Sequence, residues 1–353
     1  MTRHFTALFG IDLPIIQAPM AGNDTPALAI AVANAGGLGS LGCAMLSPEQ
    51  VRAAVATFRA ESRAPLNLNF FCHASPPADA DQSAWRTALA PYYAEHGLDA
   101  NAPLPPATRT PFDEAYCAVV EECRPQVVSF HFGLPSPALL DRVRATGAKV
   151  VCSATTVAEA RHLDEAGCDA IVAMGQEAGG HRGTFLATAM TQPVGIFSLL
   201  PQVVDVVKVP VIAAGGIADP RGVAAAFALG ASAVQVGTAY LFCPEAKVSA
   251  LHRAALASAQ ADETAITNVF TGRPARGIVN RLVREQGPIS TTAPPFPLAS
   301  AAVLPLRAAA EAAGRGDFTN LWSGQSARLA RAMSAADMTH WLAQGLPRPS
   351  ASP

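Results

Sequence analysis

The sequence has few charged and few aromatic residues, and these shortages exclude several classes of protein. Charged side chains make up 15% of the residues and aromatic side chains 6%, whereas 50% are hydrophobic. A chain of this composition can bury a large core, so general disorder is not expected. The formal net charge of −2 provides no overall basic field for nucleic acid or an anionic membrane surface.

Paired cysteines and long apolar runs are also missing. None of the 7 cysteines forms a Cys-x-x-Cys pair, which is typical of reduced, buried thiols. No apolar stretch reaches the ~20 residues that a membrane-spanning helix needs. Arg3 and His4 precede any apolar run, so no signal peptide is expected. We therefore predict a cytoplasmic enzyme, monomeric or homodimeric, that binds a small molecule rather than nucleic acid or a membrane.

Short apolar runs alternate with Ala- and Leu-rich helical stretches eight times. The predicted strands are 14–18, 38–41, 66–71, 127–130, 149–153, 170–173, 211–214 and 233–236. Their continuous apolar character indicates that both faces are buried, as in a parallel sheet covered by helices. Eight such repeats predict a closed (β/α)8 barrel, the TIM-barrel fold.

Two segments do not follow this rhythm. Residues 72–111, rich in Pro, Ala and Asp, are predicted to be an insertion after the third strand, with helical potential at 85–95. Residues 245–353 are predicted to be a mainly helical C-terminal extension that covers the barrel mouth. The expected organisation is thus a barrel over 1–244 followed by this extension.

The predicted helices lie between these strands. They cover 26–35, a stretch that opens at 47–50, 136–146, 157–166, 196–207 and 220–229. The sequence Ser47-Pro48-Glu49-Gln50 is typical of a helix start, because Ser47 and Gln50 can form a capping box and Pro48 suits the first turn.

Two glycine-bearing loops follow the seventh and eighth predicted strands. The first contains Gly215 and Gly216 and leads into a helix, and the second contains Gly237 and Thr238. In α/β barrels these loops form the usual phosphate site, because glycines expose backbone N–H groups and a helix N-terminus attracts an anion. The sequence therefore predicts a phosphate-binding site at this place.

His181 is the candidate catalytic residue. It lies between glycines, within residues 179–183, directly after the sixth predicted strand. An imidazole on such a loop packs poorly but reaches a substrate well, so it predicts a general base. His73 and His131 could line the same mouth or form local hydrogen bonds, and Glu177 could buttress the loop.

Other motifs carry no function. Residues 37–42 match Gly-x-Gly-x-x-Gly, but they follow a predicted helix and contain a predicted strand, the wrong context for dinucleotide binding. The chain has no His-Glu-x-x-His, no zinc-type Cys/His spacing, no P-loop and no Gly-x-Ser-x-Gly. No metal site is expected.

Several of these segments together resemble the nitronate monooxygenases, most closely the class I branch. They are residues 17–22, 177–183, 214–219 and 235–238, with further similarity at 67–73, 131–133 and 322–325. The resemblance covers nearly the whole chain. It implies non-covalent FMN in a barrel and oxidation, with O2, of alkyl nitronates, propionate-3-nitronate among them, or of nitroalkanes to a carbonyl compound and nitrite.

The resemblance also implies roles for individual residues. The positions that match FMN contacts are Asn69, Gly179, Gly180, Gly216, Gln235, Val236, Gly237 and Thr238, while Met20 and Ala21 would lie under the isoalloxazine. His181 matches the family's catalytic histidine, which takes the α-proton of a neutral nitroalkane or positions the nitro group of a nitronate. Phe71 and His131 are expected on the substrate side.

Two positions depart from the family pattern. Met174, still expected beside the cofactor, stands where the family often has Gln, so a hydrogen bond to the flavin would be absent or supplied by Gln176. Residues 294–302 lack the Tyr and Lys of class I members, which leaves the substrate open. The alternatives are an FMN-dependent NAD(P)H reductase acting on an enoyl-thioester or quinone, a non-catalytic flavin-binding protein, and a barrel that binds a phosphorylated substrate.

Overall fold

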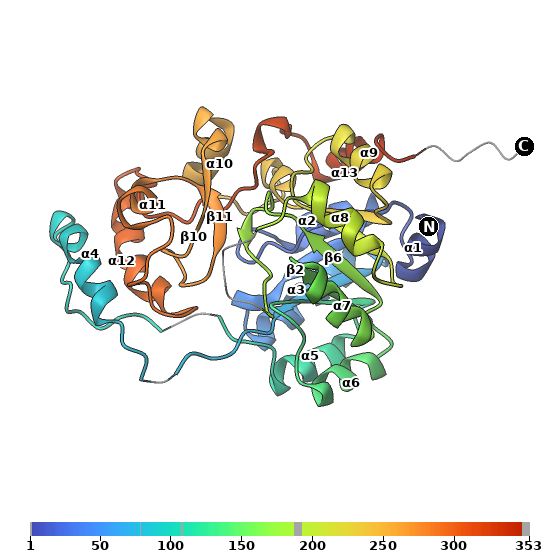
Figure 1. Cartoon of the computed structure of the whole chain (residues 1–353), viewed down its shortest axis with the longest axis horizontal. Coiled ribbons are helices and arrows are strands. Elements are labelled where there is room, and N and C mark those ends of the chain that lie inside the picture. Colours follow the sequence, from blue (N-terminus) through green and yellow to red (C-terminus); the bar gives the residue numbers. More distant parts are fainter. Residues whose placement is uncertain (1, 78, 107–108, 187–192, 348–353) are drawn as a thin grey trace, which may run out of the picture.

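The computed structural model describes residues 2–77, 79–106, 109–186 and 193–347 (Figure 1). Its centre is a barrel of eight parallel strands: β1 (Ile15–Gln17), β2 (Gly39–Gly42), β3 (Leu66–Phe71), β4 (Val127–His131), β5 (Lys149–Ala154), β6 (Ala170–Met174), β8 (Val211–Ala214) and β9 (Ala233–Val236). The strands pair in the order β1-β9-β8-β6-β5-β4-β3-β2. A parallel bridge between Ile16 and Leu38 joins the two ends. The predicted (β/α)8 barrel is confirmed.

Helices surround the barrel and follow its strands. They are α2 (Pro26–Asn34), α3 (Pro48–Glu61), α5 (Glu114–Cys123), α6 (Pro137–Ala145), α7 (Val157–Glu165), α8 (Ile196–Val204) and α9 (Pro220–Ala228), with the 3-10 turns η1 (Cys43–Met45) and η2 (Thr238–Phe242). At the start of α3, Ser47 and Gln50 form the predicted capping box. The helix α5 has no counterpart among the predicted helices.

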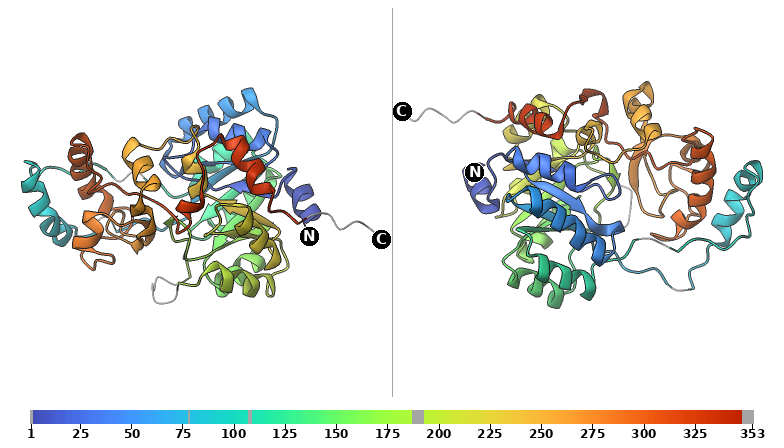
Figure 2. Two further views of the ribbon diagram at one scale, coloured as in Figure 1. Left: turned by 90° about the horizontal axis from the view of Figure 1, so that it is seen from above. Right: turned by 180° about the vertical axis from the view of Figure 1, so that it is seen from behind.

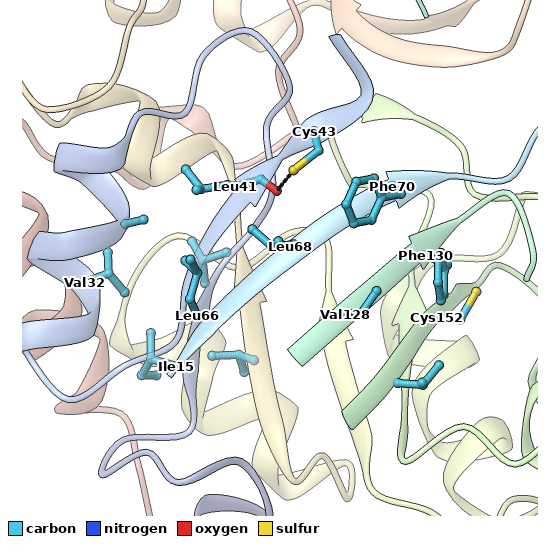
Figure 3. Close-up of a cluster of buried hydrophobic side chains, with 14 of the residues drawn as sticks. Ile15, Val32, Leu41, Cys43, Leu66, Leu68, Phe70, Val128, Phe130 and Cys152 are labelled. Atoms are coloured by element: carbon cyan, nitrogen blue, oxygen red, sulfur yellow. Dashed lines mark hydrogen bonds between the residues drawn. The ribbon is translucent and has the colours of Figure 1, made fainter. Parts of the chain in front are cut away.

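Alternation along the strands separates the barrel interior from the layer under the helices. In β3, Leu66, Leu68 and Phe70 belong to the large core between the strands and the helices (Figure 3), whereas Asn67 and Asn69 lie between them in the sequence. Side chains of a strand point alternately to opposite faces, so the two asparagines point into the barrel. This period of two decides which residues reach the site.

A short N-terminal helix, α1 (Thr2–Phe9), was not predicted. Phe5 and Phe9 from this helix pack with inward-facing strand residues, among them Val127, Val151 and Ile212. These residues lie at or near the starts of their strands. The helix therefore closes the amino-terminal end of the barrel and leaves the carboxyl-terminal end for a site.

A second lobe lies beside the carboxyl ends of the strands (Figures 1 and 2). It contains α10 (Ala250–Ala257), η3 (Ala259–Asp262), β10 (Thr264–Thr267), β11 (Ala275–Ile278), α11 (Arg281–Gln286) and α12 (Ala299–Ala312). The antiparallel strands β10 and β11 are joined by β7 (Gly180–His181). The sequence predicted neither β10 nor β11, and it placed residues 180–181 in a loop.

The insertion after β3 belongs to this lobe. Its helix α4 (Ser83–Glu95), close to the predicted 85–95, packs on α12. Trp85 is fully buried and donates a hydrogen bond from Nε1 to the backbone oxygen of Ala299, at 3.2 Å. Tyr93 donates its hydroxyl to the backbone oxygen of Ala302, at 2.7 Å. The insertion thus contributes to a second hydrophobic core.

The chain returns to the barrel at its C-terminal end. After η4 (Ala327–Leu329), the helix α13 (Ala335–Ala343) packs against α2, α9 and β1. It thereby takes the place of the helix after β9 and completes the ring of eight. The structure differs here from the expected division at 244/245, because a local pattern cannot show that a distant helix returns to the barrel.

Two further features concern the chain as a whole. Among the described residues, no helix is long and apolar enough to cross a membrane. The seven cysteines are free thiols.

Candidate active site

A cavity of about 840 Å³ lies at the carboxyl ends of the barrel strands and extends under the second lobe. Its size is in the range of small-molecule and cofactor sites. The residues expected at the site that line it are Met20, Ala21, Asn69, Phe71, His131, Met174, Gly179, Gly180, His181, Gly215, Gly216, Gln235, Gly237 and Thr238. The structure therefore brings together residues from six different strand ends.

Val236 is the exception among the expected site residues. Its side chain is 1% exposed and packs in the core between the strands and the helices. Gln235, the preceding residue of β9, lines the cavity instead. The alternation of side chains along a strand explains the difference, so only the backbone of Val236 remains available to a ligand.

Loops after β6, β8 and β9 expose backbone N–H groups to the cavity. Those of Gly179, Gly216 and Gly237 have no hydrogen-bond acceptor in the described part of the chain. Gly216 has φ +73°, a conformation that favours glycine. Such unpaired N–H groups form an anion-binding nest.

The helix α9 contributes less to this nest than the sequence suggested. Asp219 caps it, accepting hydrogen bonds from the backbone N–H groups of Arg221 and Gly222 at 2.9 and 3.2 Å. The helix N-terminus is therefore already occupied by a carboxylate. An anion would be held by the glycine loops instead.

A C-terminal segment, residues 322–326, crosses these loops and fixes them. The Gly324 N–H donates to Thr238 Oγ1 at 2.9 Å, and Ser326 Oγ donates to the Gly216 backbone oxygen at 2.8 Å. A Cβ added at Gly179 would lie 2.5 Å from the Gly324 nitrogen. Close backbone approach therefore explains the glycines at 179 and 324.

The loop after β1 forms another wall of the cavity. Asp24 accepts hydrogen bonds from the N–H groups of Met20 and Gly42, at 2.7 and 2.8 Å, and so ties this loop to β2. The pKa of Asp24 is raised to about 6, because the effect of burial exceeds the opposing effect of its backbone hydrogen bonds. Asp24 thus holds Met20 and Ala21 at the cavity although it was not predicted to matter.

Asn69 and Met174 present different groups to the cavity. Asn69 Nδ2 donates to the backbone oxygen and the hydroxyl of Ser129, at 3.2 and 2.9 Å. Its Oδ1 remains available as an acceptor. Met174 offers only a thioether, and Gln176 does not line the cavity. Gln176 therefore does not replace the amide that is missing at position 174.

His181 lies within a set of four aromatic rings, which we name the aromatic box. The ring centroids of Phe71, Phe132, Phe296 and Trp322 are 6.1, 6.0, 5.3 and 5.5 Å from that of His181. Most of these contacts are edge-to-face. The box restricts the orientation of the imidazole, while His181 still lines the cavity.

A threonine is the side-chain hydrogen-bond partner of His181. Thr271 Oγ1 lies 3.0 Å from His181 Nε2 and 3.3 Å from the backbone oxygen of Arg273. A hydroxyl has one proton, and a carbonyl oxygen can only accept. When the Thr271 hydroxyl donates to Arg273, Nε2 of His181 carries the proton and Nδ1 is the basic nitrogen.

The histidines of the site are neutral. Burial, followed by the charge of Arg109, lowers the pKa of His181 well below its usual value. Burial lowers the pKa of His131 to about 3. Nε2 of His131 lies 3.1 Å from the His181 carbonyl oxygen and donates to it, and Nδ1 accepts from the Ser153 hydroxyl at 2.6 Å. His131 therefore positions the backbone of His181.

Buried arginines and Glu177 hold the loop that carries His181. Arg182 donates to the backbone oxygens of Met174 and Gly175, at 3.1 and 2.5 Å. Arg276 donates to that of Gln176 at 2.8 Å. Glu177 accepts from the Ile196 N–H at the start of α8, which is the buttressing role considered for it.

Three residues near the site were not singled out from the sequence: Thr271, Phe296 and Arg109. Thr271 and Phe296 lie in the second lobe, 90 and 115 positions along the chain from His181. No local motif marks them. His73 does not line the cavity but packs edge-on against Phe296, with ring centroids 4.7 Å apart.

Comparison with sequence families and curated proteins gives a consistent result. The nitronate monooxygenase family profile matches residues 2–345. A nitronate monooxygenase of Paraburkholderia phytofirmans is 43% identical over 347 residues, which cover 98% of this chain and 95% of that protein. A nitronate monooxygenase of Pseudomonas aeruginosa is 42% identical, with 98% and 99% coverage.

Solved structures show the same architecture. A nitroalkane oxidase from Streptomyces ansochromogenes has a TM-score of 0.87 and 37% identity, and 96% of each chain is covered. FabK from Thermotoga maritima has a TM-score of 0.73 and 30% identity, with 97% of this chain and 94% of that chain covered.

Proposed function

The chain belongs to the nitronate monooxygenase family, and we propose that it uses FMN and O2 to oxidise alkyl nitronates, propionate-3-nitronate among them, or nitroalkanes. The products are a carbonyl compound and nitrite. Two nitronate anions and one O2 give two carbonyl compounds and two nitrite anions, so the reaction balances. His181 is the general base for neutral nitroalkanes.

The residues of the cavity fit FMN. The unpaired N–H groups of Gly179, Gly216 and Gly237 suit the phosphate, and Asn69 and Gln235 offer polar side chains to the ring system. Met20 and Ala21 provide a wall of small or flexible side chains, which a planar group can approach. Bound FMN would supply the one-electron redox chemistry, and the protein supplies binding, orientation and proton transfer.

His181 can accept a proton because it is neutral and held in place. Its Nδ1 would take the α-proton of a nitroalkane while Nε2 remains bonded to Thr271. An anionic nitronate formed beside the new imidazolium would stabilise it, because an opposite charge nearby raises the pKa of histidine. A nitronate supplied from solution needs no base, only the positioning.

The observation that carries this proposal is the balance of charge around the cavity. Arg109, Lys247, Arg253 and Arg307 line it. Among the described lining residues, Glu177 is the one carboxylate, and it is bonded to the Ile196 N–H. A cavity with this balance favours anionic ligands. Both the FMN phosphate and a nitronate are anions.

Oxygen consumption tests the proposal directly. FMN-loaded protein is expected to consume O2 with propionate-3-nitronate or with ethyl nitronate, and to release nitrite. The variant His181→Asn should retain nitronate turnover within about tenfold but lose about 100-fold or more of its activity on neutral nitroethane. FMN content is measured in both proteins. Absence of oxygen consumption with every nitronate would refute the proposal.

The alternative of an NAD(P)H-dependent reductase has a separate signature. The departures from the family pattern at Met174 and in residues 294–302 keep it as a second candidate. Under anaerobic conditions, NADH or NADPH would bleach the flavin absorbance rapidly in such a reductase. We expect slow or no bleaching, and rapid bleaching would favour the reductase.

A further inference from the structure

Arg109 is a cation of the cavity that has no ion-pair partner among the residues that the structure describes. It lies at the end of the insertion and lines the cavity, and its guanidinium carbon is 5.8 Å from the centroid of the Phe296 ring. Its side chain has no hydrogen bond or ion pair within the described part of the chain. Burial, followed by the charge of Arg307, lowers the pKa of Arg109 to about 10, so it stays protonated at neutral pH.

The other cations of the cavity differ from Arg109. Arg307 is bonded to Glu311 and Asn320, each at 2.7 Å. Arg253 donates to backbone oxygens, including that of Leu241 at 3.2 Å. Lys247 is exposed to solvent. Arg109 alone among these four is both partly buried and without an acceptor in the described residues.

Partial burial of a guanidinium that has no partner is costly, and an aromatic face compensates only part of the cost. Removing a charge from water without a partner is among the largest penalties in a folded protein. A cation over an aromatic ring is stabilised by a much smaller amount. Arg109 therefore remains available to pair with an anion that enters the cavity.

The position of Arg109 relative to His181 indicates which anion this is. Phe296 is in contact with both residues, because its ring centroid is 5.3 Å from that of His181 and 5.8 Å from the Arg109 guanidinium carbon. Among the neighbouring charges, that of Arg109 lowers the pKa of His181 most. Arg109 and His181 thus lie beside the same ring and both line the cavity, so a molecule bound at His181 can extend toward Arg109.

We propose that Arg109 determines substrate specificity by binding a carboxylate at the end of the substrate remote from its nitro group. A guanidinium binds a carboxylate through two parallel hydrogen bonds, which gives both affinity and orientation. Arg109 is a binding residue and takes no part in proton transfer. The inference rests on the proposed function, because that function places the reacting carbon at His181.

The test compares two substrates of similar size in three proteins. Propionate-3-nitronate carries a carboxylate at the end remote from the nitronate group. Butyl-1-nitronate has an uncharged ethyl group in that place. In Arg109→Gln, kcat/KM for propionate-3-nitronate should fall about 10- to 100-fold, chiefly through KM, as expected for the loss of a charged hydrogen bond. The value for butyl-1-nitronate should change less than about threefold. Arg109→Lys should restore part of the loss.

A control variant and a binding measurement complete the design. Arg63→Gln removes one exposed positive charge far from the cavity and should leave both substrates unaffected. Succinate, a dicarboxylate that cannot react, is titrated by the fluorescence of the protein, to which Trp322 at the cavity contributes. Its Kd should rise about tenfold or more in Arg109→Gln and stay unchanged in Arg63→Gln.

These measurements separate the two proposals. If no nitronate is turned over but succinate binding depends on Arg109, the proposed function fails and the carboxylate site stands. A second outcome is that nitronates are turned over, but kcat/KM falls equally for both substrates in Arg109→Gln or does not change for propionate-3-nitronate. Either result overturns the assignment of Arg109. Equal succinate affinity in wild type and Arg109→Gln would overturn it as well.

Discussion

His181 shows how its surroundings decide the chemistry of one residue. An exposed histidine is partly protonated near neutral pH, but burial and the charges of Arg109 and Arg273 keep this imidazole neutral. Thr271 orients it through Nε2. The sequence indicated the residue and its exposed loop, whereas its protonation and tautomer depend on neighbours in another lobe.

Asp24 provides a prediction about pH at the residue scale. Its pKa is about 6 in the folded protein against 3.8 ordinarily, so between these values the folded state binds more protons than the unfolded state. Stability contributed by Asp24 is therefore fully present below pH 3.8 and is lost as the pH rises to about 6. In Asp24→Asn, whose side-chain oxygen can still accept from Met20 and Gly42, this loss should disappear.

Thermal unfolding between about pH 4 and 7 checks this expectation. Relative to wild type, Asp24→Asn should gain roughly 2–3 kcal/mol of stability as the pH rises from 4 to 7. Asp24→Ala is the matched control, because it removes the acceptor as well and should be less stable than Asp24→Asn throughout. A wild-type advantage that grows with pH would contradict the prediction.

At the scale of elements, the helix α4 connects the insertion to the second lobe. Trp85 is fully buried in that lobe's core, and truncation of a buried Trp costs about 3–5 kcal/mol. Trp85→Ala should therefore release α4 from α12 and expose residues 72–111 to proteases. Tyr93→Phe loses only the hydrogen bond to Ala302 and should cost about 1 kcal/mol.

Limited proteolysis and urea unfolding measure the two effects. Cleavage within the insertion should be much faster in Trp85→Ala than in Tyr93→Phe, and the two parts of the nicked barrel should stay associated. If the two variants are cleaved at equal rates and unfold at the same urea concentration, α4 is not held by Trp85 in the way the structure indicates.

At the scale of the whole molecule, a ligand in the cavity would connect the barrel with the second lobe. Residues of both line it, Gly216 and Trp322 among them. A ligand that binds only the folded state raises its stability by about 2.7 kcal/mol at a concentration of 100 times Kd. FMN should therefore raise the midpoint of thermal unfolding by several degrees.

Riboflavin is the matched comparison, because it lacks the phosphate. If the nest of Gly179, Gly216 and Gly237 binds the phosphate, riboflavin at the same concentration should raise the midpoint less than FMN does. The measurement is a thermal shift on flavin-free protein with each compound. An equal shift with both would show that the glycine loops do not bind the phosphate.

The sequence by itself determined the barrel and the strand ends that form its site. The strand pattern and the glycine loops are local, since continuous apolar runs and glycines at turns reflect constraints within a few residues. Eight repeats then leave closure as the favoured arrangement. Alternation along β9 is a local property of the same kind, and it directs the Val236 side chain into the core and away from the cavity.

Only the tertiary structure decided the remaining features, because they depend on residues far apart in the chain. His181 is bonded to Thr271, 90 positions later, and β7 forms only when β11 pairs with it. α13 completes the barrel by packing on α2 and α9 after the second lobe has been built. Such contacts leave no periodic signal in the sequence, because they form between residues that only the folded chain brings together. The glycine-flanked histidine was thus visible in the sequence, and the box and cations that give it a chemistry were not.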